Sequence, residues 1–307
     1  MKISAIVPTY RRADDLQRCL QALENQERKA DEVIVVVRSS DKETQNILKN
    51  MNKKHLNLRI SLVSKPGQVA ALNAGLKAAK GDIIAFTDDD TISHKDWLNR
   101  IENHFLSDEQ IGGVGGRDFL YENGKLAEGK KETVGKLQWF GRLIGYHHLG
   151  YGMPREVDML KGANMSFTRE AISGLKFDTR LRGGAEVRND TAFCLAVKKR
   201  RWKLIYDPKV IVDHYPAVRY EANKRGNYDW KAVEDGAHNE TLVLLDYLPF
   251  IRKFAYFIYM VFIGNIFTPG IVEFLRILPK EKGNAFLRLM AAYKGRYEGW
   301  KTYRNSK

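Results

Sequence analysis

Short apolar runs alternate with amphipathic stretches along the first 90 residues of the chain. The apolar runs, each short enough for a buried strand, lie at residues 3–7, 33–37 and 83–86. Helical periodicity is found between them, at residues 14–25, 41–54 and 68–79. This alternation predicts βαβ units on a parallel sheet, whose ligands bind beyond the carboxyl ends of the strands. We therefore expect functional residues directly after each strand.

The pattern becomes less regular beyond residue 100. Residues 110–160 are rich in Gly and aromatic side chains and predict no clear element. After them we predict a strand at 162–167, a helix at 190–199, a strand at 202–206, a turn at 207–208 and a strand that ends near residue 214. The pattern predicts an α/β domain over residues 1–220. A helical, apolar and basic region is expected over residues 221–307.

One apolar segment stands out in the second region. Residues 254–272 form a run of 19 residues without a charged side chain, close to the ~20 that a membrane-spanning helix needs. Asn265, Pro269 and Gly270 interrupt it, and basic flanks that begin with Arg252 favour the side of a membrane with anionic lipid. We expect an interfacial or re-entrant helix on an anionic membrane surface, and a buried core helix is the alternative.

The charge balance supports an anionic partner. Lys and Arg outnumber Asp and Glu by 51 to 37, and residues 274–307 contain nine Lys or Arg against two Asp or Glu. The apolar run at residues 3–7 is too short for a secretory signal, and the two cysteines, Cys19 and Cys194, cannot make a disulfide framework. We therefore expect the protein at the cytoplasmic face of a membrane.

The strongest local signal is the acidic triplet Asp88, Asp89 and Asp90, directly after the apolar run at 83–86. Adjacent carboxylates repel one another, and a divalent cation relieves that repulsion. In an extended chain Asp88 and Asp90 point the same way and can hold Mg²⁺ or Mn²⁺. The alternative is a solvated acidic turn that caps a helix at residues 96–105.

Several short motifs, taken as an ordered set, resemble the family-2 glycosyltransferases of the GT-A fold. The matching pieces lie at residues 7–10, 67–73 with Gly75, 87–90, 162–165, 189–190 and 212–214. Together they cover roughly residues 3–215. The resemblance implies a Rossmann-like, mostly parallel sheet flanked by helices, a nucleoside diphosphate sugar donor and a divalent cation, Mn²⁺ or Mg²⁺.

The resemblance also implies roles for individual residues. It implies Asp90 as a metal ligand, Asp88 as a residue that faces the donor and can share the metal, and His214 as a further ligand. A structural role is the alternative for His214. The donor pocket is expected to comprise Pro8, Thr9, Tyr10, Arg38, Lys65, Gly67, Asn73, Asp88 and Asp89. Of these, Lys65, Gly67 and Asn73 are expected in a loop that closes on the donor, with a plain turn into a helix as the alternative.

The candidate general base is Asp190. Related chains usually have Glu-Asp at this place, whereas this sequence has Asn189-Asp190. The change removes one carboxylate and leaves Asp190 less basic unless another acid is near. Glu186 is that acid if the segment is helical, because residues four apart share a helix face. A helix-capping Asn-Asp pair is the alternative.

A second departure concerns the donor base. Many relatives have an aspartate after the second strand that reads the uracil edge, where this chain has Val37 and Arg38. A carboxylate accepts hydrogen bonds and a guanidinium can only donate them. A UDP-linked donor is therefore not implied.

These observations together predict an inverting, metal-dependent glycosyltransferase that acts on a lipid-linked or cell-envelope glycan. One alternative is a nucleotidyltransferase. Such an enzyme needs a basic, Gly-rich loop for a triphosphate near the first strand, and this chain has only Arg11 and Arg12 there. The other is a non-catalytic basic protein that binds lipid or nucleic acid. We expect no nucleic-acid partner, because the excess charge lies away from the α/β domain.

Overall fold

The computed structural model describes residues 1–51, 56–216 and 229–306. The chain divides into two compact units. Unit 1 comprises Met1–Lys136, Ile144–Phe177 and Phe193–Ala217, and unit 2 comprises Leu137–Leu143, Asp178–Ala192 and Val218–Lys307. The predicted domain boundary near residue 220 lies outside the described residues.

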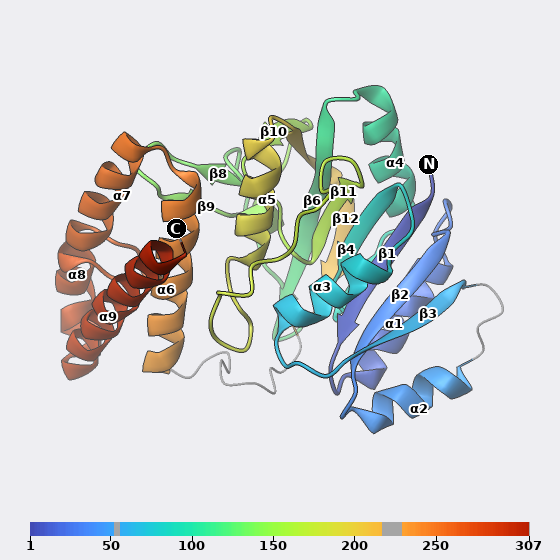
Figure 1. The fold of residues 1–307 in the computed structure, drawn as a ribbon, viewed down its shortest axis with the longest axis horizontal. Helices are drawn as coiled ribbons and strands as arrows, with labels where there is room; N and C mark the ends of the chain where they lie inside the picture. Colours follow the sequence, from blue (N-terminus) through green and yellow to red (C-terminus); the bar gives the residue numbers. More distant parts are fainter. Residues whose placement is uncertain (52–55, 217–228, 307) are drawn as a thin grey trace. The chain divides into compact units, whose positions relative to one another are not determined.

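A single mixed sheet organises unit 1 (Figure 1). Among the described residues it has ten strands, with the order β10-β12-β6-β11-β4-β1-β2-β3, while β5 pairs with β12 and β7 with β6. The strands are β1 (Ile3–Thr9), β2 (Glu32–Arg38), β3 (Leu58–Val63), β4 (Ile83–Thr87), β5 (Thr91–Ser93), β6 (Ile111–Glu122), β7 (Lys125–Leu126), β10 (Arg155–Val157), β11 (Asn164–Thr168) and β12 (Lys203–His214). A separate two-stranded pair consists of β8 (Lys136–Leu137) and β9 (Leu143–Ile144).

The strands of the central sheet are mostly parallel. Strand β1 is parallel to β2 and β4, β2 is parallel to β3, and β6 is parallel to β12. Strand β11 intervenes as an antiparallel strand between β4 and β6. The carboxyl ends of β1, β2, β4 and β12 therefore share one edge of the sheet, where ligands of such folds bind. The predicted mostly parallel sheet is confirmed.

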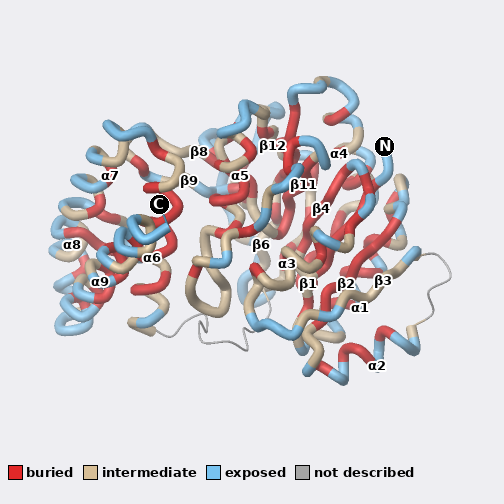
Figure 2. The backbone as a smooth tube through the Cα atoms, in the orientation of Figure 1, coloured by how far each residue is buried: buried red, intermediate tan, exposed pale blue. Residues whose placement is uncertain are grey.

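Helices cover the sheet and close the core of unit 1. They are α1 (Ala13–Glu24), α2 (Lys42–Asn50), α3 (Gln68–Ala78) and α4 (Trp97–Ser107). Helix α1 buries Leu16, Cys19, Leu20 and Leu23 in one core with the buried residues of β1 and β2 (Figure 2). Each fully buried Leu contributes about 1.5–3 kcal/mol. The expected helix at 41–54 ends at Asn50, and residues 52–55 lie outside the described part of the chain.

Two regions of unit 1 differ from the elements expected from sequence. Strand β6, which pairs with both β11 and β12, runs through the region at 110–160 for which no element was predicted. A side chain at Gly116 of β6 would collide with the carbonyl oxygen of Val210, so the close strand approach requires glycine. The predicted turn at 207–208 is wrong, because β12 continues through it with a register shift between Asp207 and Ile211.

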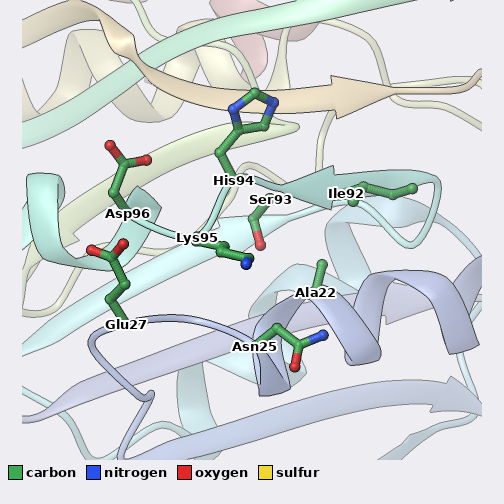
Figure 3. Close-up of a pocket in the computed structure, with 8 residues that line it drawn as sticks. All are labelled: Ala22, Asn25, Glu27, Ile92, Ser93, His94, Lys95 and Asp96. Carbon is green, nitrogen blue, oxygen red and sulfur yellow. The ribbon is translucent and has the colours of Figure 1, made fainter.

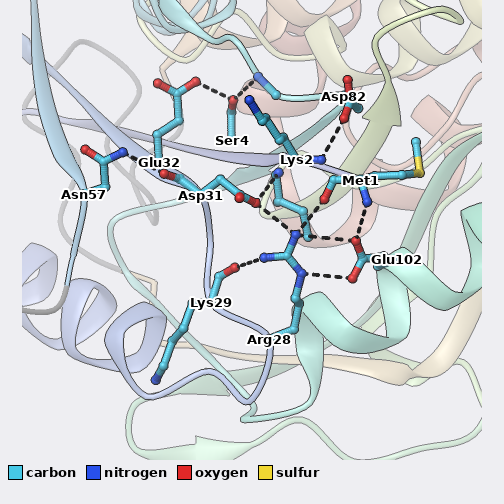
Figure 4. A network of polar contacts seen from close by, with 12 residues as sticks. Met1, Lys2, Ser4, Arg28, Lys29, Asp31, Glu32, Asn57, Asp82 and Glu102 are labelled. Carbon is cyan, nitrogen blue, oxygen red and sulfur yellow. Dashed lines mark hydrogen bonds and ion pairs between the residues drawn. The ribbon is translucent and has the colours of Figure 1, made fainter.

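Charged groups at the amino-terminal end of β1 are paired with one another (Figure 4). Arg28 donates from Nε to Glu102 at 2.9 Å and from Nη2 to Asp31 at 2.9 Å. Asp31 also accepts the backbone N–H of Ile3 at 2.8 Å, and the amino group of Met1 lies 3.0 Å from Glu102. Partial burial raises the pKa of Glu102, but Arg28 and the terminal ammonium lower it overall. These mutually satisfied charges hold the start of β1 in place.

Unit 2 is helical apart from its connecting segments. Its helices are α6 (Trp230–Tyr247), α7 (Phe250–Phe262), α8 (Ile271–Glu281) and α9 (Gly283–Asn305), and α5 (Asn189–Lys199) begins in this unit. Helices α6 and α9 pack closely, and Gly295 of α9 permits this, because a side chain at that position would collide with the Glu234 carbonyl. This closeness fixes the position of α6 within the unit.

The apolar segment at 254–272 is not one helix. Helix α7 ends at Phe262, a turn at Gly264 with φ of +72° follows, and α8 begins at Ile271. Within the described ranges, no helix is both long enough and apolar enough to cross a membrane. Phe254 is 67% exposed and Phe267 73% exposed, so the segment is not a buried core helix either.

Candidate active site

The acidic triplet follows β4 as a turn. The backbone N–H of Thr91 donates to the carbonyl of Asp88 at 3.3 Å, and the Thr91 hydroxyl donates to the same carbonyl at 2.8 Å. The chain is therefore not extended here, which was the condition for Asp88 and Asp90 to point the same way, and it is the turn that places their carboxylates together. Asp90 is 7% exposed and Asp89 is 2% exposed. Helix α4 begins later, at Trp97, so the triplet does not cap it.

His214 is brought to the triplet by strand pairing. Strand β5 is antiparallel to β12, so that His214 lies opposite Thr91, and Tyr215 donates its N–H to the Asp90 carbonyl at 2.9 Å. Nε2 of His214 is 3.4 Å from Oδ1 of Asp90. Ligand atoms of Asp88, Asp90 and His214 all lie within 4.8 Å of one another. Residues predicted as metal ligands from separate motifs thus form one group.

The electrostatics of this group suit a divalent cation. Burial raises the pKa of Asp88, and the neighbouring Asp90 carboxylate raises it further. Burial also raises the pKa of Asp89 to about 7, against the opposing effect of Arg12. Burial and like-charge repulsion destabilise the ionised carboxylates, and a bound cation would offset both effects. The two carboxylates suit both Mn²⁺ and Mg²⁺, whereas the imidazole is a ligand for Mn²⁺ rather than for Mg²⁺, so the residues present fit Mn²⁺ better.

Two residues that no sequence motif marked support His214 from its other side. Asp118 of β6 is fully buried, with Oδ2 3.5 Å from Nδ1 of His214, and it also pairs with Lys161. Burial raises the pKa of Asp118, but His214 and Lys161 outweigh it and lower the value to about 2. Burial lowers the pKa of His214, whereas Asp118 and Asp90 raise it to about 9. A carboxylate behind a ligating histidine orients the ring.

Arg12, which the sequence suggested only as part of a triphosphate-binding loop, is a third residue that supports the site. It follows β1, and its Nη1 lies 2.9 Å from Oδ1 of Asp89 and 3.7 Å from Oδ2 of Asp90. Asp89 therefore has a cationic partner within the protein. No motif marked Arg12, because its role depends on where β4 places the acidic turn.

Predicted donor-binding residues lie at the ends of β1 and β2. Pro8 and Thr9 are the last residues of β1, and Thr9 is 6% exposed. Tyr10 follows them, and the guanidinium of Arg38, at the end of β2, lies 4.6 Å from the Tyr10 ring centroid. Arg11 lies 5.2 Å from the same centroid. An aromatic ring and two cations thus share the carboxyl edge with the acidic turn.

The remaining donor residues lie around α3. Lys65 is exposed, and Gly67, with φ of +106°, immediately precedes the helix. Asn73 lies within α3 rather than in a loop, which corrects the expectation. Its side chain accepts the N–H of Phe177 at 2.8 Å and donates to the carbonyl of Phe177 at 2.9 Å. These bonds tie α3 to the segment that leaves β11.

Asp190 and Glu186 belong to unit 2. Asp190 lies in the first turn of α5 and accepts the N–H of Thr191 at 2.6 Å. Glu186 precedes the helix with φ of +39°, so the helical spacing that suggested a pair with Asp190 is absent. Asn189 donates to the Glu186 carbonyl at 3.0 Å. The catalytic roles of both acids stay predictions.

Helix α6 anchors the segment before Asp190, which no sequence pattern suggested. Fully buried Asn239 accepts the N–H of Arg182 at 2.8 Å and donates to the carbonyls of Arg182 and Val187 at 2.9 and 3.1 Å. The next residue, Glu240, pairs with Arg188 at 2.6 Å. Arg188 has φ of +74°, a conformation that side chains rarely adopt. The contacts with α6 stabilise this strained backbone.

A hollow of about 520 Å³ lies elsewhere in unit 1, between the end of α1 and the start of α4 (Figure 3). Its lining residues are Ala22, Asn25, Glu27, Ile92, Ser93, His94, Lys95 and Asp96. None of them is a predicted site residue, and their charges are mixed. We therefore base the site on the residues after the strands and not on this hollow.

Comparisons with known proteins agree on a family. The model of glycosyl transferase family 2 matches residues 4–172. Glycosyltransferase AglE of Haloferax volcanii is 32% identical over 140 residues, 44% of this chain and 46% of that protein, so the match spans less than half of that relative. The dolichyl N-acetyl-alpha-D-glucosaminyl phosphate 3-beta-D-2,3-diacetamido-2,3-dideoxy-beta-D-glucuronosyltransferase of Methanococcus voltae is 24% identical over 292 residues, 90% of this chain and 84% of that protein.

The fold has a solved counterpart. A mannosyltransferase of Pyrobaculum calidifontis, in complex with GDP-Man and Mn²⁺, superposes with a TM-score of 0.61 at 19% sequence identity, over 99% of this chain and 84% of that one. This similarity confirms the predicted GT-A type of α/β fold. Since the family model matches more than half of the residues, the chain belongs to glycosyl transferase family 2.

Proposed function

We propose that the protein is an inverting glycosyltransferase that moves a sugar from a nucleoside diphosphate sugar to an acceptor hydroxyl. The observation that carries the proposal is the group of Asp88, Asp90 and His214, on the same sheet edge as Tyr10 and Arg38. The family supports transfer chemistry. The Methanococcus voltae relative is named for a dolichyl phosphate-linked sugar, which supports a lipid-linked or cell-envelope glycan as the acceptor.

Asp88, Asp90 and His214 would hold Mn²⁺ or Mg²⁺. The bound ion would supply positive charge against the departing diphosphate, a contribution of several kcal/mol. The mannosyltransferase solved with Mn²⁺ supports this choice of ion. Asp118 orients the His214 ring, with Nε2 toward Asp90. Arg12 offsets the charge of Asp89, which limits repulsion within the triplet.

Tyr10 and Arg38 are the proposed contacts of the donor nucleotide, together with Pro8, Thr9, Lys65 and Gly67. The Arg38 guanidinium lies against the Tyr10 ring, and its N–H groups are donors of the kind that a phosphate or a base carbonyl accepts. A base with carbonyl acceptors would therefore be favoured. GDP- and UDP-linked sugars are the first donors to test.

The proposed reaction is one displacement at the anomeric carbon. The acceptor oxygen forms a bond to that carbon from the face opposite the diphosphate, and the bond to the diphosphate oxygen breaks with its electron pair. Asp190 takes the proton of the acceptor hydroxyl, a step that contributes roughly 10²–10⁴ in rate. Glu186 is the second candidate for this role. Attack from the opposite face inverts the configuration of the sugar.

The test is a donor screen with the full chain and Mn²⁺. Purified protein would be incubated with GDP- and UDP-linked sugars and with isoprenoid phosphate-linked monosaccharides as acceptors. We expect Mn²⁺-dependent release of a nucleoside diphosphate, and a product whose anomeric configuration by NMR is opposite to that of the donor. Retention of configuration would refute the single displacement. Release of pyrophosphate from a nucleoside triphosphate would point to a nucleotidyltransferase instead.

A further inference from the structure

The outer helices of unit 2 expose an apolar surface that is unusual for a protein in water. Large hydrophobic side chains recur at helical spacing on each helix. They include Phe250, Phe254 and Phe257 on α7, Ile271, Leu275 and Leu278 on α8, and Phe286 and Met290 on α9. The buried residues of α7 and α8 are Tyr256, Met260 and Ile277, on the opposite faces. Contiguous apolar patches of this kind mark interaction sites.

The helices that carry this surface are in contact with one another. Helix α8 packs against both α7 and α9, so the three helices form one assembly, and each has exposed segments (Figure 2). Helices α7 and α8 have 13 and 11 residues, which corresponds to about 20 and 16 Å at 1.5 Å per residue. The hydrocarbon core of a bilayer is about 30 Å thick. Either helix therefore fits in the plane of a bilayer surface better than across it.

Trp139 extends the apolar surface beyond the helices. It is 61% exposed, and its carbonyl accepts a hydrogen bond from Nε of Arg252 on α7 at 2.9 Å. The neighbouring Phe140 contacts Tyr259 of α7, with ring centroids 4.8 Å apart. The segment is thereby held on α7 with its indole exposed. Trp side chains are enriched at the interface between lipid and water.

The charge of the same helices identifies the partner. Exposed cations accompany the apolar residues, and they include Arg276, Lys280, Lys282, Lys294 and Lys301. Residues 274–307 contain nine Lys or Arg against two Asp or Glu, and of these nine only Arg288 and Arg296 are buried among the described residues. Anionic lipid attracts such cations, whereas a second copy of the chain in a symmetric dimer would place the same positive surface against itself.

We propose that the exposed faces of α7, α8 and α9, with Trp139, insert into the surface of a bilayer that contains anionic lipid. The apolar side chains enter the boundary between headgroups and acyl chains, and the cations remain among the headgroups. The proposal does not depend on the transfer reaction, since it concerns only the exposed residues of unit 2.

The test is vesicle sedimentation with the full chain. Vesicles of phosphatidylcholine with added phosphatidylglycerol are compared with vesicles of phosphatidylcholine alone, at about 0.1 and 1 M salt, where the Debye length falls from about 10 to 3 Å. We expect binding to the mixed vesicles that 1 M salt weakens but does not abolish, because apolar insertion is not screened.

Two variants separate the apolar and charged contributions. The double variant Phe254→Ser/Phe257→Ser should weaken vesicle binding at least tenfold, whereas Leu106→Ser, a matched change at a residue of unit 1 that is 66% exposed, should leave it unchanged. Lys280→Glu/Lys282→Glu should reduce the preference for anionic vesicles. Equal losses for Leu106→Ser and the Phe variant would overturn the proposal.

Two further measurements distinguish a lipid surface from a second copy of the chain and from a loss of folding. Analytical ultracentrifugation tests for the second copy. The proposal would be overturned if the wild-type protein formed a dimer that does not bind vesicles and if the Phe variant were a monomer. Circular dichroism and thermal unfolding are measured on the same samples. Variants that lose vesicle binding but keep the wild-type spectrum and melting temperature are folded and support the proposal, whatever the outcome of the donor screen.

Discussion

The two units differ in where they place large apolar side chains. In unit 1 the central strands β2 and β4 bury their apolar residues, as at Val35 and Phe86, and three acidic groups lie in the turn after β4. In unit 2, α6 buries His238 and Asn239, while α7 exposes Phe254. Both units bury some polar groups, and in unit 1 these include Asp89, Asp90 and Asp118. Unit 2 differs in the large apolar side chains that its outer helices expose to water.

Buried polar side chains in unit 2 have a specific structural requirement. Buried polar groups that lack partners cost about 1–3 kcal/mol each, so the polar interior of unit 2 has to be organised by hydrogen bonds. Asn239 satisfies this requirement through the segment that precedes Asp190. We therefore expect changes at the unit 1 site to alter nucleotide binding, and changes in the interior of unit 2 to alter turnover and stability but not nucleotide binding.

The largest effect is expected for Asp90→Ala in unit 1. Removal of a charged ligand should abolish Mn²⁺-dependent nucleotide binding and lower turnover by roughly 10³-fold, because several kcal/mol of stabilisation are lost. Thermal shift with Mn²⁺ and nucleotide measures the binding, and diphosphate release measures the turnover. Asp96→Ala, which removes a surface carboxylate paired with Arg100, is the control and should behave as wild type. An unchanged Mn²⁺ response in Asp90→Ala would show that this residue is not a metal ligand.

Asp190→Asn should separate chemistry from binding. The amide has the size of the carboxylate but cannot take a proton, so turnover should fall by roughly 10²–10⁴-fold while the nucleotide dissociation constant stays the same. Single-turnover kinetics and isothermal titration measure the two quantities. Asp246→Asn, a change of a carboxylate that pairs with Arg180, serves as the control in the same unit. Wild-type turnover for Asp190→Asn would direct attention to Glu186.

Asn239→Ala tests whether the interior of unit 2 acts through the segment before Asp190. Loss of its hydrogen bonds should lower the free energy of unfolding by about 1–3 kcal/mol and reduce kcat, with the nucleotide dissociation constant unchanged. Asn239→Asp keeps an acceptor for the Arg182 N–H but turns a carboxylate oxygen toward the carbonyls of Arg182 and Val187, so it should destabilise the protein at least as much as Asn239→Ala. A variant with lower stability but full kcat would limit Asn239 to a structural role.

The smallest effect is expected for Arg38→Lys. The change keeps the charge but removes the planar guanidinium that lies over Tyr10 and can donate parallel hydrogen bonds to the nucleotide. One lost hydrogen bond contributes about 0.5–1 kcal/mol, so nucleotide affinity should fall about two- to fivefold. Titration calorimetry can resolve this difference. Arg59→Lys, which alters a residue paired with Glu32, is the matched control. Equal affinity for Arg38→Lys and wild type would remove Arg38 from the donor pocket.

Much of unit 1 could be predicted because its signals are local. The apolar runs that became β1, β2 and β4 are continuous in sequence, and α1 shows its buried face in the spacing of Leu16, Cys19 and Leu20. The acidic triplet was visible for the same reason, as were His214 and Asp190 through the ordered motifs. Strand β6 could not be predicted, because glycines disfavour a strand unless neighbouring strands approach closely, and that approach is not visible in the sequence.

The sequence by itself determined the family, the alternation of strands and helices, and the residue types available for a cation. Only the tertiary structure decided which partners those residues have. Arg12, Asp118 and Lys161 come from three separate segments, and the order of strands in the sheet brings them to Asp89 and His214. The same holds for Asn239, whose contacts with Arg182 depend on the packing of α6. Pairing between distant segments leaves no periodic pattern in a sequence, because it is fixed by register and packing.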